Sequence, residues 1–345
     1  MPSIPLDSPR WGWAPGDAVA AEHRGRACLA FGDAFLIAPL ADLELTDGAV
    51  ELDLCVTAER AFHGVVWRLE SLDEYESFFV RPHQVGNPDS IQYTPVFHGV
   101  SGWQLYHVEG FGAAIRFPTD EWFTVRVVFA GERAEVFVAD LGTPALVIGE
   151  LKRGVAAGRV GIQVGGPGLR VAAFRYEEGP VTLHAPAPPP VTRPAGTVPA
   201  WLVSDPFGED TVRSGAPLDL ASRTWTRLKV EASGLANLAR VNALTEERNT
   251  VLARATIVSA RAQTRALELG FSDRAVAYLN GAPLFRGDDT YRSRDYRFLG
   301  SIGYWDTLFL PLRAGKNELV VAVSESFGGW GIQARFPDPE GISFP

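Results

Sequence analysis

The chain has 345 residues, a length that favours two domains over one. Its 32 Lys and Arg against 41 Asp and Glu give a net charge of −9, which argues against phosphate backbones and anionic membrane surfaces as partners. No stretch reaches the roughly 18 consecutive apolar residues that a membrane helix needs. A soluble protein without a nucleic-acid or membrane partner is therefore expected.

The N-terminal segment and the cysteines bear on the cellular compartment. Residues 1–7 have neither the basic nor the apolar region of a secretory signal. Cys28 and Cys55 are the only cysteines, and no N-glycosylation sequon is present. A cytoplasmic protein without a disulfide framework is expected. Cys55, in an alternating apolar run, is predicted to be a small buried side chain.

Short β-branched and aromatic runs dominate the first half of the chain. Gly, Pro, Asn and Asp interrupt them about every ten residues, which is the spacing of an antiparallel sandwich. Most runs alternate apolar with polar residues, so one face of each strand should be buried. The predicted strands are 35–37, 48–57, 63–69, 75–81, 103–108, 122–129, 133–138, 158–164 and 169–177.

Between residues 178 and 199 the composition changes to Pro, Ala, Thr and Val. Proline-rich segments stiffen into polyproline II and cannot join a sheet, so this stretch is predicted to be a semi-rigid linker. The expected domains are residues 1–178 and 200–345, with a linker over 179–199. Proteolysis within 181–198 should then release two folded fragments.

The second half resumes the β pattern, and both halves together predict an all-β protein of two antiparallel jelly-roll sandwiches in tandem. Its predicted strands are 225–231, 251–259, 265–271, 274–279, 308–312, 318–324 and 331–336. Asn280-Gly281 predicts a tight type I′ hairpin turn, because both residues tolerate positive φ. Residues 237–248 are expected to form one short helix or a loop, and Trp330 is expected to be buried between sheets.

Several catalytic motifs are absent from the sequence. It has no dinucleotide fingerprint, no phosphate-binding loop, no His-Glu-x-x-His helix and no Cys-x-x-Cys pair. No cofactor and no metal site are predicted, and the sequence leaves open whether a structural calcium is bound. Glu51 and Asp53 alternate in one strand, as do the acids of sandwich glucanases, but Val56 stands where a third acid is needed. The two acids are therefore interpreted as the solvated face of a strand.

The densest polar and aromatic region lies between residues 81 and 107 and holds three of the six histidines, with His63 shortly before it. Amide, carboxylate and guanidinium groups pair with sugar hydroxyls, and aromatic rings cover the apolar face of a pyranose. An alternative is that internal hydrogen bonds simply hold this loop together. The predicted ligand-binding residues are Arg68, Arg81, His83, Gln84, Asp89, Gln92, Tyr93, Trp103, Gln104 and Tyr106.

Two different positions, core and rim, can be expected for Trp103. Alternation along a strand would place Trp103, Leu105 and His107 on one face, which is either the core or the rim. The rim is favoured, where the indole would stack on a sugar. The stretch 291–297 is rich in Arg and Tyr, and Arg294 is expected to find an anionic or aromatic partner in the first domain.

Four motifs of the first half resemble the concanavalin A-like lectin/glucanase jelly roll. They are FHGVVWR at 62–68, YESFFVRPH at 75–83, QYTPV at 92–96 and WQLY at 103–106. The likeness covers roughly residues 25–178 and is strongest to bacterial members related to laminin-G-like and sugar-hydrolase modules. It implies that the concave sheet and its rim loops hold glycans. The acid cluster of the glucanases is not matched, which argues against hydrolysis.

The second half is similar to the galactose-binding-like jelly roll that accompanies many glycoside hydrolases. The resemblance rests on AYLNGAPLF at 277–285 and LPLRAGKNEL at 310–319. It implies a carbohydrate-linked context and no particular activity.

The leading hypothesis is a non-catalytic carbohydrate-binding protein whose first sandwich holds the ligand. The first alternative is a glycoside hydrolase or lyase in which Asp89 or Glu109 acts as acid/base and His83 or His107 assists. The second is a structural or adaptor protein. The sequence leaves the identity of the sugar and the oligomeric state open.

Overall fold

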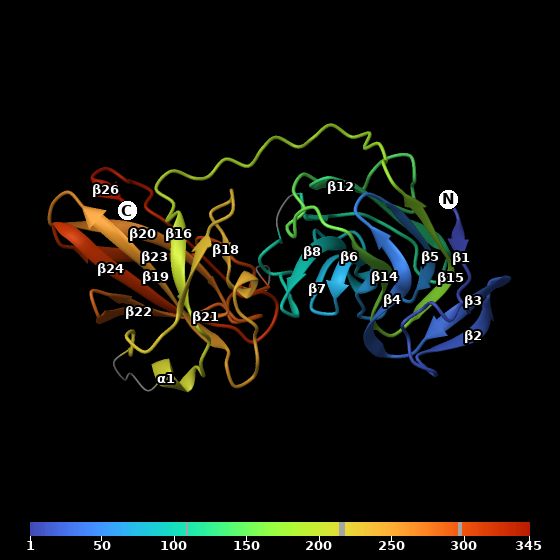
Figure 1. The fold of residues 1–345 in the computed structure, drawn as a ribbon, viewed down its shortest axis with the longest axis horizontal. Helices are drawn as coiled ribbons and strands as arrows, with labels where there is room; N and C mark the ends of the chain where they lie inside the picture. Colours follow the sequence, from blue (N-terminus) through green and yellow to red (C-terminus); the bar gives the residue numbers. More distant parts are fainter. Residues whose placement is uncertain (108–109, 214–217, 296–298) are drawn as a thin grey trace. The chain divides into compact units, whose positions relative to one another are not determined.

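The computed structural model describes residues 1–107, 110–213, 218–295 and 299–345 (Figure 1). The chain is nearly all β and its strands pair antiparallel, so the predicted all-β fold class is confirmed. It divides into two compact units. Unit 1 comprises Met1–Val96 and Tyr106–Pro190, and unit 2 comprises Phe97–Leu105 and Val191–Pro345.

Unit 1 is a sandwich whose first sheet has the order β13-β12-β11-β5-β15-β3-β2, with β1 paired to β15. A hairpin joins β11 to β12 in this sheet, and Ala130 pairs with Arg133 across its turn. The strands are β1 (Ser3–Ile4), β2 (Ala18–His23), β3 (Arg26–Phe31), β5 (Gly48–Val56), β11 (Phe123–Ala130), β12 (Arg133–Val138), β13 (Leu146–Ile148) and β15 (Leu169–Glu178).

The second sheet of unit 1 has the order β10-β8-β7-β6-β14-β4. Alternate side chains of its strands, such as Trp67 and Phe78, face the first sheet and form the core with residues such as Leu52. A short 3₁₀ helix, η1 (Pro82–Gln84), follows β7 directly. The strands are β4 (Ala34–Leu45), β6 (His63–Ser71), β7 (Glu74–Val80), β8 (Ile91–Phe97), β10 (Gly112–Ala113) and β14 (Gly158–Gly166).

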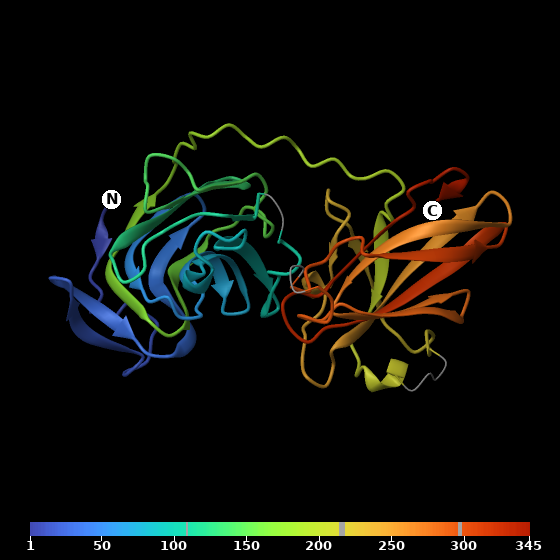
Figure 2. The same ribbon diagram turned by 180° about the vertical axis from the view of Figure 1, so that it is seen from behind.

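Unit 2 is a second sandwich, visible from both sides in Figures 1 and 2. One sheet has the order β17-β16-β19-β24-β21-β22, with β26 paired to β19, and the other has the order β18-β25-β20-β23. The strands of the first are β16 (Ala200–Ser204), β17 (Trp225–Lys229), β19 (Thr250–Ser259), β21 (Arg274–Leu279), β22 (Ala282–Asp288), β24 (Gly315–Ser324) and β26 (Ile342–Ser343). Those of the second are β18 (Ala236–Asn237), β20 (Gln263–Ser272), β23 (Asp306–Leu312) and β25 (Gly331–Arg335). The short strand β9 (Val100–Ser101) pairs with β8, and α1 (Asp210–Arg213) and η2 (Leu238–Arg240) lie outside the sheets.

Three local predictions are confirmed. Asn280 and Gly281 have φ of 51° and 81° and join β21 to β22 in the predicted tight turn. Trp330 is fully buried, and its indole N–H donates to the Val323 carbonyl at 3.0 Å. Cys55 is fully buried in β5.

Residues 237–248 contain the short 3₁₀ turn η2 followed by a loop, in agreement with the expectation of one short helix or a loop. Two other local predictions are wrong. Residues 103–105 form a turn and not the start of a strand. Glu51 and Asp53 are not on a solvated face, because both are nearly buried and pair with the guanidinium of Arg175. In that sheet, arginines on neighbouring strands supply the positive charge that a buried carboxylate needs.

The predicted linker is shorter in the structure than in the sequence. Val181 and Leu183 pack against unit 1, and the Ala185 amide donates to Glu135 at 2.5 Å. At the other end, Val198 belongs to the core of unit 2. The stretch between these anchors has no strand or helix.

In the described part of the chain, no helix is long and apolar enough to cross a membrane.

Candidate functional site

Arg81 is the centre of the polar group that the structure assembles in unit 1. It follows β7, in which Phe78 and Val80 face the core. Alternation therefore turns Phe79 and Arg81 to the opposite face of the sheet. The Arg81 guanidinium lies 4.9 Å from the centre of the Phe79 ring and 5.6 Å from that of Phe62.

The Arg81 guanidinium is held in place by hydrogen bonds as well as by rings. It is 4% exposed, and it donates to the Asp89 carbonyl at 2.8 Å and to Gln92 Oε1 at 2.5 Å. Gln92 in turn donates to the Tyr106 carbonyl at 2.8 Å. A buried charge is stable only with such partners. Arg81 and Gln92 are therefore fixed in position among the side chains around them.

Two partly exposed histidines lie beside Arg81. Burial lowers the pKa of His83, and the positive charges of Arg60 and Arg81 lower it further, while Asp89 opposes them. Burial also lowers the pKa of His107, again helped by Arg81 and opposed by Asp89. Both imidazoles are therefore neutral at pH 7, and each offers one N–H donor and one nitrogen acceptor.

We call Phe62, Phe79, Arg81, His83, Asp89, Gln92 and His107 the Arg81 group. It unites five of the residues that the sequence singled out, namely Arg81, His83, Asp89, Gln92 and His107. Gln84 lies in the adjacent η1 and accepts a hydrogen bond from Asn87 at 2.5 Å. The sequence analysis missed Phe62 and Phe79, although alternation in β7 places Phe79 on the same face as Arg81. Glu109 lies outside the described residues.

Three predicted ligand residues of unit 1 are interior side chains. Arg68 is 3% exposed and donates to the carbonyls of Thr46, Gly131 and Gly154. Tyr93 is fully buried and donates to Glu76 at 2.6 Å. Tyr106 is 1% exposed and packs edge-on against a phenylalanine ring. Each is engaged within unit 1 and adds stability to it.

Trp103 and Gln104 belong to unit 2 and not to the first sandwich, where the sequence analysis placed them. The Trp103 ring centroid lies 6.3 Å from that of Tyr291 and 5.7 Å from that of Phe327. We call these three residues the ring cluster. Trp103 is partly exposed, so the interpretation of Trp103 as a core residue does not hold.

Gln104, the residue after Trp103, connects the ring cluster to two loops of unit 2. It is fully buried, its amide nitrogen donates to the Leu299 carbonyl at 2.9 Å, and its backbone N–H donates to the Gly328 carbonyl at 2.8 Å. Arg294 finds its carboxyl partners inside unit 2, in Asp289 and Asp306, and not in the first domain as expected. Residues 296–297 of the same stretch lie outside the described residues.

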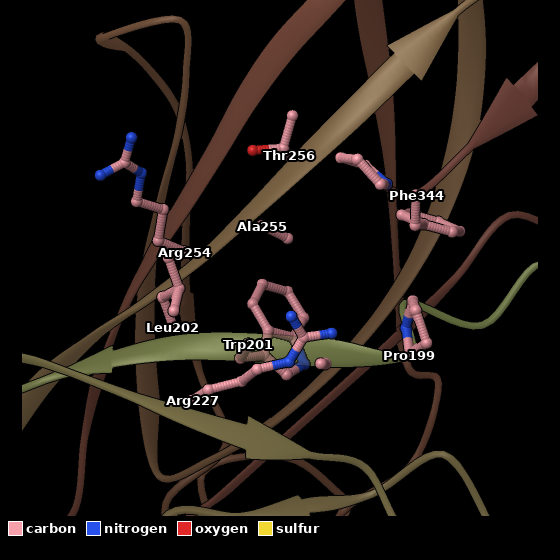
Figure 3. A pocket seen from close by; sticks show the side chains of 10 residues that line it. Pro199, Trp201, Leu202, Arg227, Arg254, Ala255, Thr256 and Phe344 are labelled. Atoms are coloured by element: carbon pink, nitrogen blue, oxygen red, sulfur yellow. The ribbon is translucent and has the colours of Figure 1, made fainter.

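Unit 2 also contains a small hollow, which Figure 3 shows from close by. Its volume is about 130 Å³, and Arg227 extends into it while Arg254 pairs with Glu318 at 2.6 Å. None of the predicted ligand residues lines it. Among the described residues, no group of three or more His, Cys, Asp and Glu side chains is placed to hold a metal ion.

Comparisons with known proteins identify no family. No family model matches the chain, and no curated protein matches it. Similar solved structures include the carbohydrate-binding module CBM66 from Bacillus subtilis, at 12% identity over 50% of this chain and 97% of that one, with a TM-score of 0.33.

Two further structures are similar to this chain at the same level. Domain 4 of AbnA, a GH43 extracellular arabinanase from Geobacillus stearothermophilus solved with arabinotriose, is 12% identical over 48% of this chain and 78% of that one, with a TM-score of 0.33. Domains LG4-5 of the mouse laminin alpha1 chain are 14% identical over 94% and 83%, with a TM-score of 0.30. These identities and TM-scores carry no argument about a ligand, which must come from the residues themselves.

Proposed function

We propose that this chain binds a carbohydrate and that the Arg81 group of unit 1 contacts it. The observation that supports this best is that His83, His107 and Asp89 are partly exposed around a guanidinium that Gln92 and two rings hold still. A preorganised set of polar groups loses little conformational entropy on binding.

The chemistry of the Arg81 group matches that of sugar hydroxyls. A hydroxyl is both a donor and an acceptor, and a neutral imidazole complements it in both roles. Asp89 and Gln84 add acceptors beside the two histidines, and the partly exposed Phe62 adds an apolar surface. Such a mixture of few polar groups and aromatic carbon is typical of small-molecule sites.

A second candidate is an enzyme that acts on a glycoside. Its support is that two neutral imidazoles lie close enough to Asp89 for that carboxylate to affect their pKa values. A neutral imidazole accepts a proton near neutral pH, as a general base must. Hydrolysis of glycosides usually employs two carboxyl groups, and within its described residues the Arg81 group contributes one.

The test is a calorimetric titration of the full chain with β-linked hexasaccharides of glucose, xylose, mannose, galactose and arabinose. His83→Ala and His107→Ala should each weaken binding of the best ligand. A net hydrogen bond contributes about 0.5–1.5 kcal/mol, so the dissociation constant should rise about 2- to 12-fold. Mass spectrometry of the incubated ligand then separates binding from turnover.

His184→Ala is the matched control, because His184 is an exposed histidine outside the Arg81 group. Its affinity should equal that of the wild type. If no saccharide binds, or if all three histidine variants bind equally well, the Arg81 group does not contact a carbohydrate. Reaction products in the incubated sample would favour the second candidate, an enzyme, over a binding protein.

A further inference from the structure

The ring cluster of unit 2 joins side chains from three distant parts of the sequence. The rings of Tyr291 and Phe327 are 6.2 Å apart, and Trp103 contacts both. Phe327 is 51% exposed, and the other two rings are partly exposed. A single exposed aromatic side chain is ordinary, but three that meet at the surface mark a site of contact.

The backbone around the ring cluster is built to hold these positions. Gly328 has a φ of 111°, and a Cβ there would lie 2.1 Å from Gln104 Oε1. Only glycine therefore allows the buried Gln104 to reach this point. Ser326 is fixed as well, because its N–H donates to Asp273 Oδ2 at 3.0 Å and its hydroxyl accepts from Arg274 at 3.0 Å.

Tyr291 is held from the other side of the ring cluster. It follows a turn in which Thr290 N–H donates to Asp288 Oδ1 at 2.9 Å and Ser293 N–H donates to the Thr290 carbonyl at 2.8 Å. The exposed Arg292, at a φ of 67°, places its guanidinium 4.9 Å from the centre of the Tyr291 ring. A donor with a permanent positive charge thus stands beside the partly exposed Tyr291 ring.

The size of the ring cluster selects among classes of ligand. A stable protein partner buries about 800 Å² on each side, whereas one aromatic side chain offers roughly 150–250 Å² in full. Three rings that are each partly buried fall well short of a protein interface. They suit the apolar C–H face of a pyranose, whose hydroxyls would be within the reach of Arg292.

We propose that Trp103, Tyr291 and Phe327 form a second saccharide-contacting surface, on unit 2, which binds pyranose units through their C–H face. This surface is separate from the Arg81 group in its residues and in its unit. Its formation depends on Gln104, which brings Trp103 to Phe327.

The test uses the full chain and the same five hexasaccharides. Phe327→Ala removes the most exposed ring, and its thermal midpoint should stay near that of the wild type. Loss of the stacking contact should weaken binding of at least one hexasaccharide about tenfold, or remove one of two binding events in the titration. Phe309→Ala is the control, because Phe309 is 66% exposed on β23 and is not part of the ring cluster.

The outcomes separate this inference from the proposed function. If Phe327→Ala and Phe309→Ala both bind every hexasaccharide as the wild type does, the ring cluster is no saccharide surface, whatever the His83 and His107 variants do. If wild-type chains associate in sedimentation and Phe327→Ala alone abolishes this, the rings serve a second copy of the chain and the inference is equally overturned. Selective loss in Phe327→Ala supports it, including when the histidine variants bind normally.

Discussion

Arg68 and Arg81 are two arginines of the same predicted ligand set with different surroundings. Arg68 lies beneath three backbone carbonyls in unit 1, and burial lowers its pKa while Glu76 and Asp47 oppose this. Arg81 is paired with a side-chain amide next to exposed imidazoles. The first therefore supports the fold, and the second supports a site.

Replacing Arg68 tests this division. Arg68→Met leaves the carbonyls of Thr46, Gly131 and Gly154 without their donor, and each unpaired buried group costs about 1–3 kcal/mol. The free energy of unfolding should fall by about 3 kcal/mol or more in urea denaturation, while saccharide affinity per folded molecule stays unchanged. A stable variant with weakened binding would return Arg68 to the ligand site.

The histidines of the Arg81 group give the proposed binding a defined pH dependence. Both pKa values lie below the ordinary 6.5, so both imidazoles are mainly neutral at and above that pH. Affinity should remain constant between about pH 8 and 6.5 and weaken only at lower pH, as the imidazoles gain charge next to Arg81. Titrations across this range check the expectation. Affinity that is already falling between pH 8 and 7 would contradict it.

Three buried carboxyl groups give unit 2 a pH dependence of the opposite kind. Burial raises the pKa of Asp273 to about 6 and that of Asp289 to about 7, with Arg294 opposing the shift at Asp289. Burial also raises the pKa of Glu325 well above its usual value, and the negative charge of Asp273 adds to this. The folded state thus keeps protons that the unfolded state has already released.

Since the folded pKa values exceed the unfolded ones, the stability is fully present below about pH 4 and is lost as pH rises towards about 7. The thermal midpoint of unit 2 should therefore fall between about pH 5 and pH 8. Asp289→Asn, which has no proton to lose, should flatten this fall. Calorimetry of the full chain measures both, and a midpoint that rises over the same range would show that the carboxyl groups are ionised in the fold.

At the scale of elements, local sequence patterns predicted where the strands lie better than they predicted which face of a strand is buried. The Asn280-Gly281 turn and the alternation in β7 follow from two or three neighbouring residues. The burial of Glu51 and Asp53 depends on arginines that are far away in the sequence, which no local pattern reveals. Likewise, Trp103 to Leu105 alternate like a strand, but Gln104 donates hydrogen bonds to loops about two hundred residues further along the chain.

The segment Phe97–Leu105 also changes what cleavage of the linker should do. A cut between Pro186 and Arg193 divides unit 2 into two pieces, because Phe97–Leu105 stays on the N-terminal fragment. The pieces should co-elute in gel filtration, held by the contacts of the buried Gln104. Two separate peaks after such a cut would show that this segment is not a stable part of unit 2.

Gln104→Ala provides the complementary experiment. It removes the donor to Leu299 and leaves a cavity beneath Trp103, at a cost of about 2–3 kcal/mol. The nicked variant should dissociate under conditions in which the nicked wild type does not. Gln163→Ala, a partly exposed glutamine of unit 1, serves as the control and should behave like the wild type.

At the scale of the whole molecule, two sandwiches offer two differently built polar and aromatic surfaces. Composition and turn spacing predicted the all-β class, since strands and turns follow from local residue types. The candidate site was predictable only as a set of residues. Which of them meet depends on pairing between strands. Of the described candidates, this brought five to the Arg81 group, placed Gln84 next to it, and brought Trp103 and Gln104 to unit 2 and Arg68, Tyr93 and Tyr106 to the interior.

Hydrogen exchange of the full chain with and without the best-bound hexasaccharide tests the central claim most directly. If the Arg81 group holds the ligand, backbone amides between His83 and Gln92 and at His107 should exchange more slowly in the complex. The variant His83→Ala should lose this protection at the same ligand concentration. A bound saccharide that leaves these amides unchanged and protects others in unit 1 would contradict the proposed site.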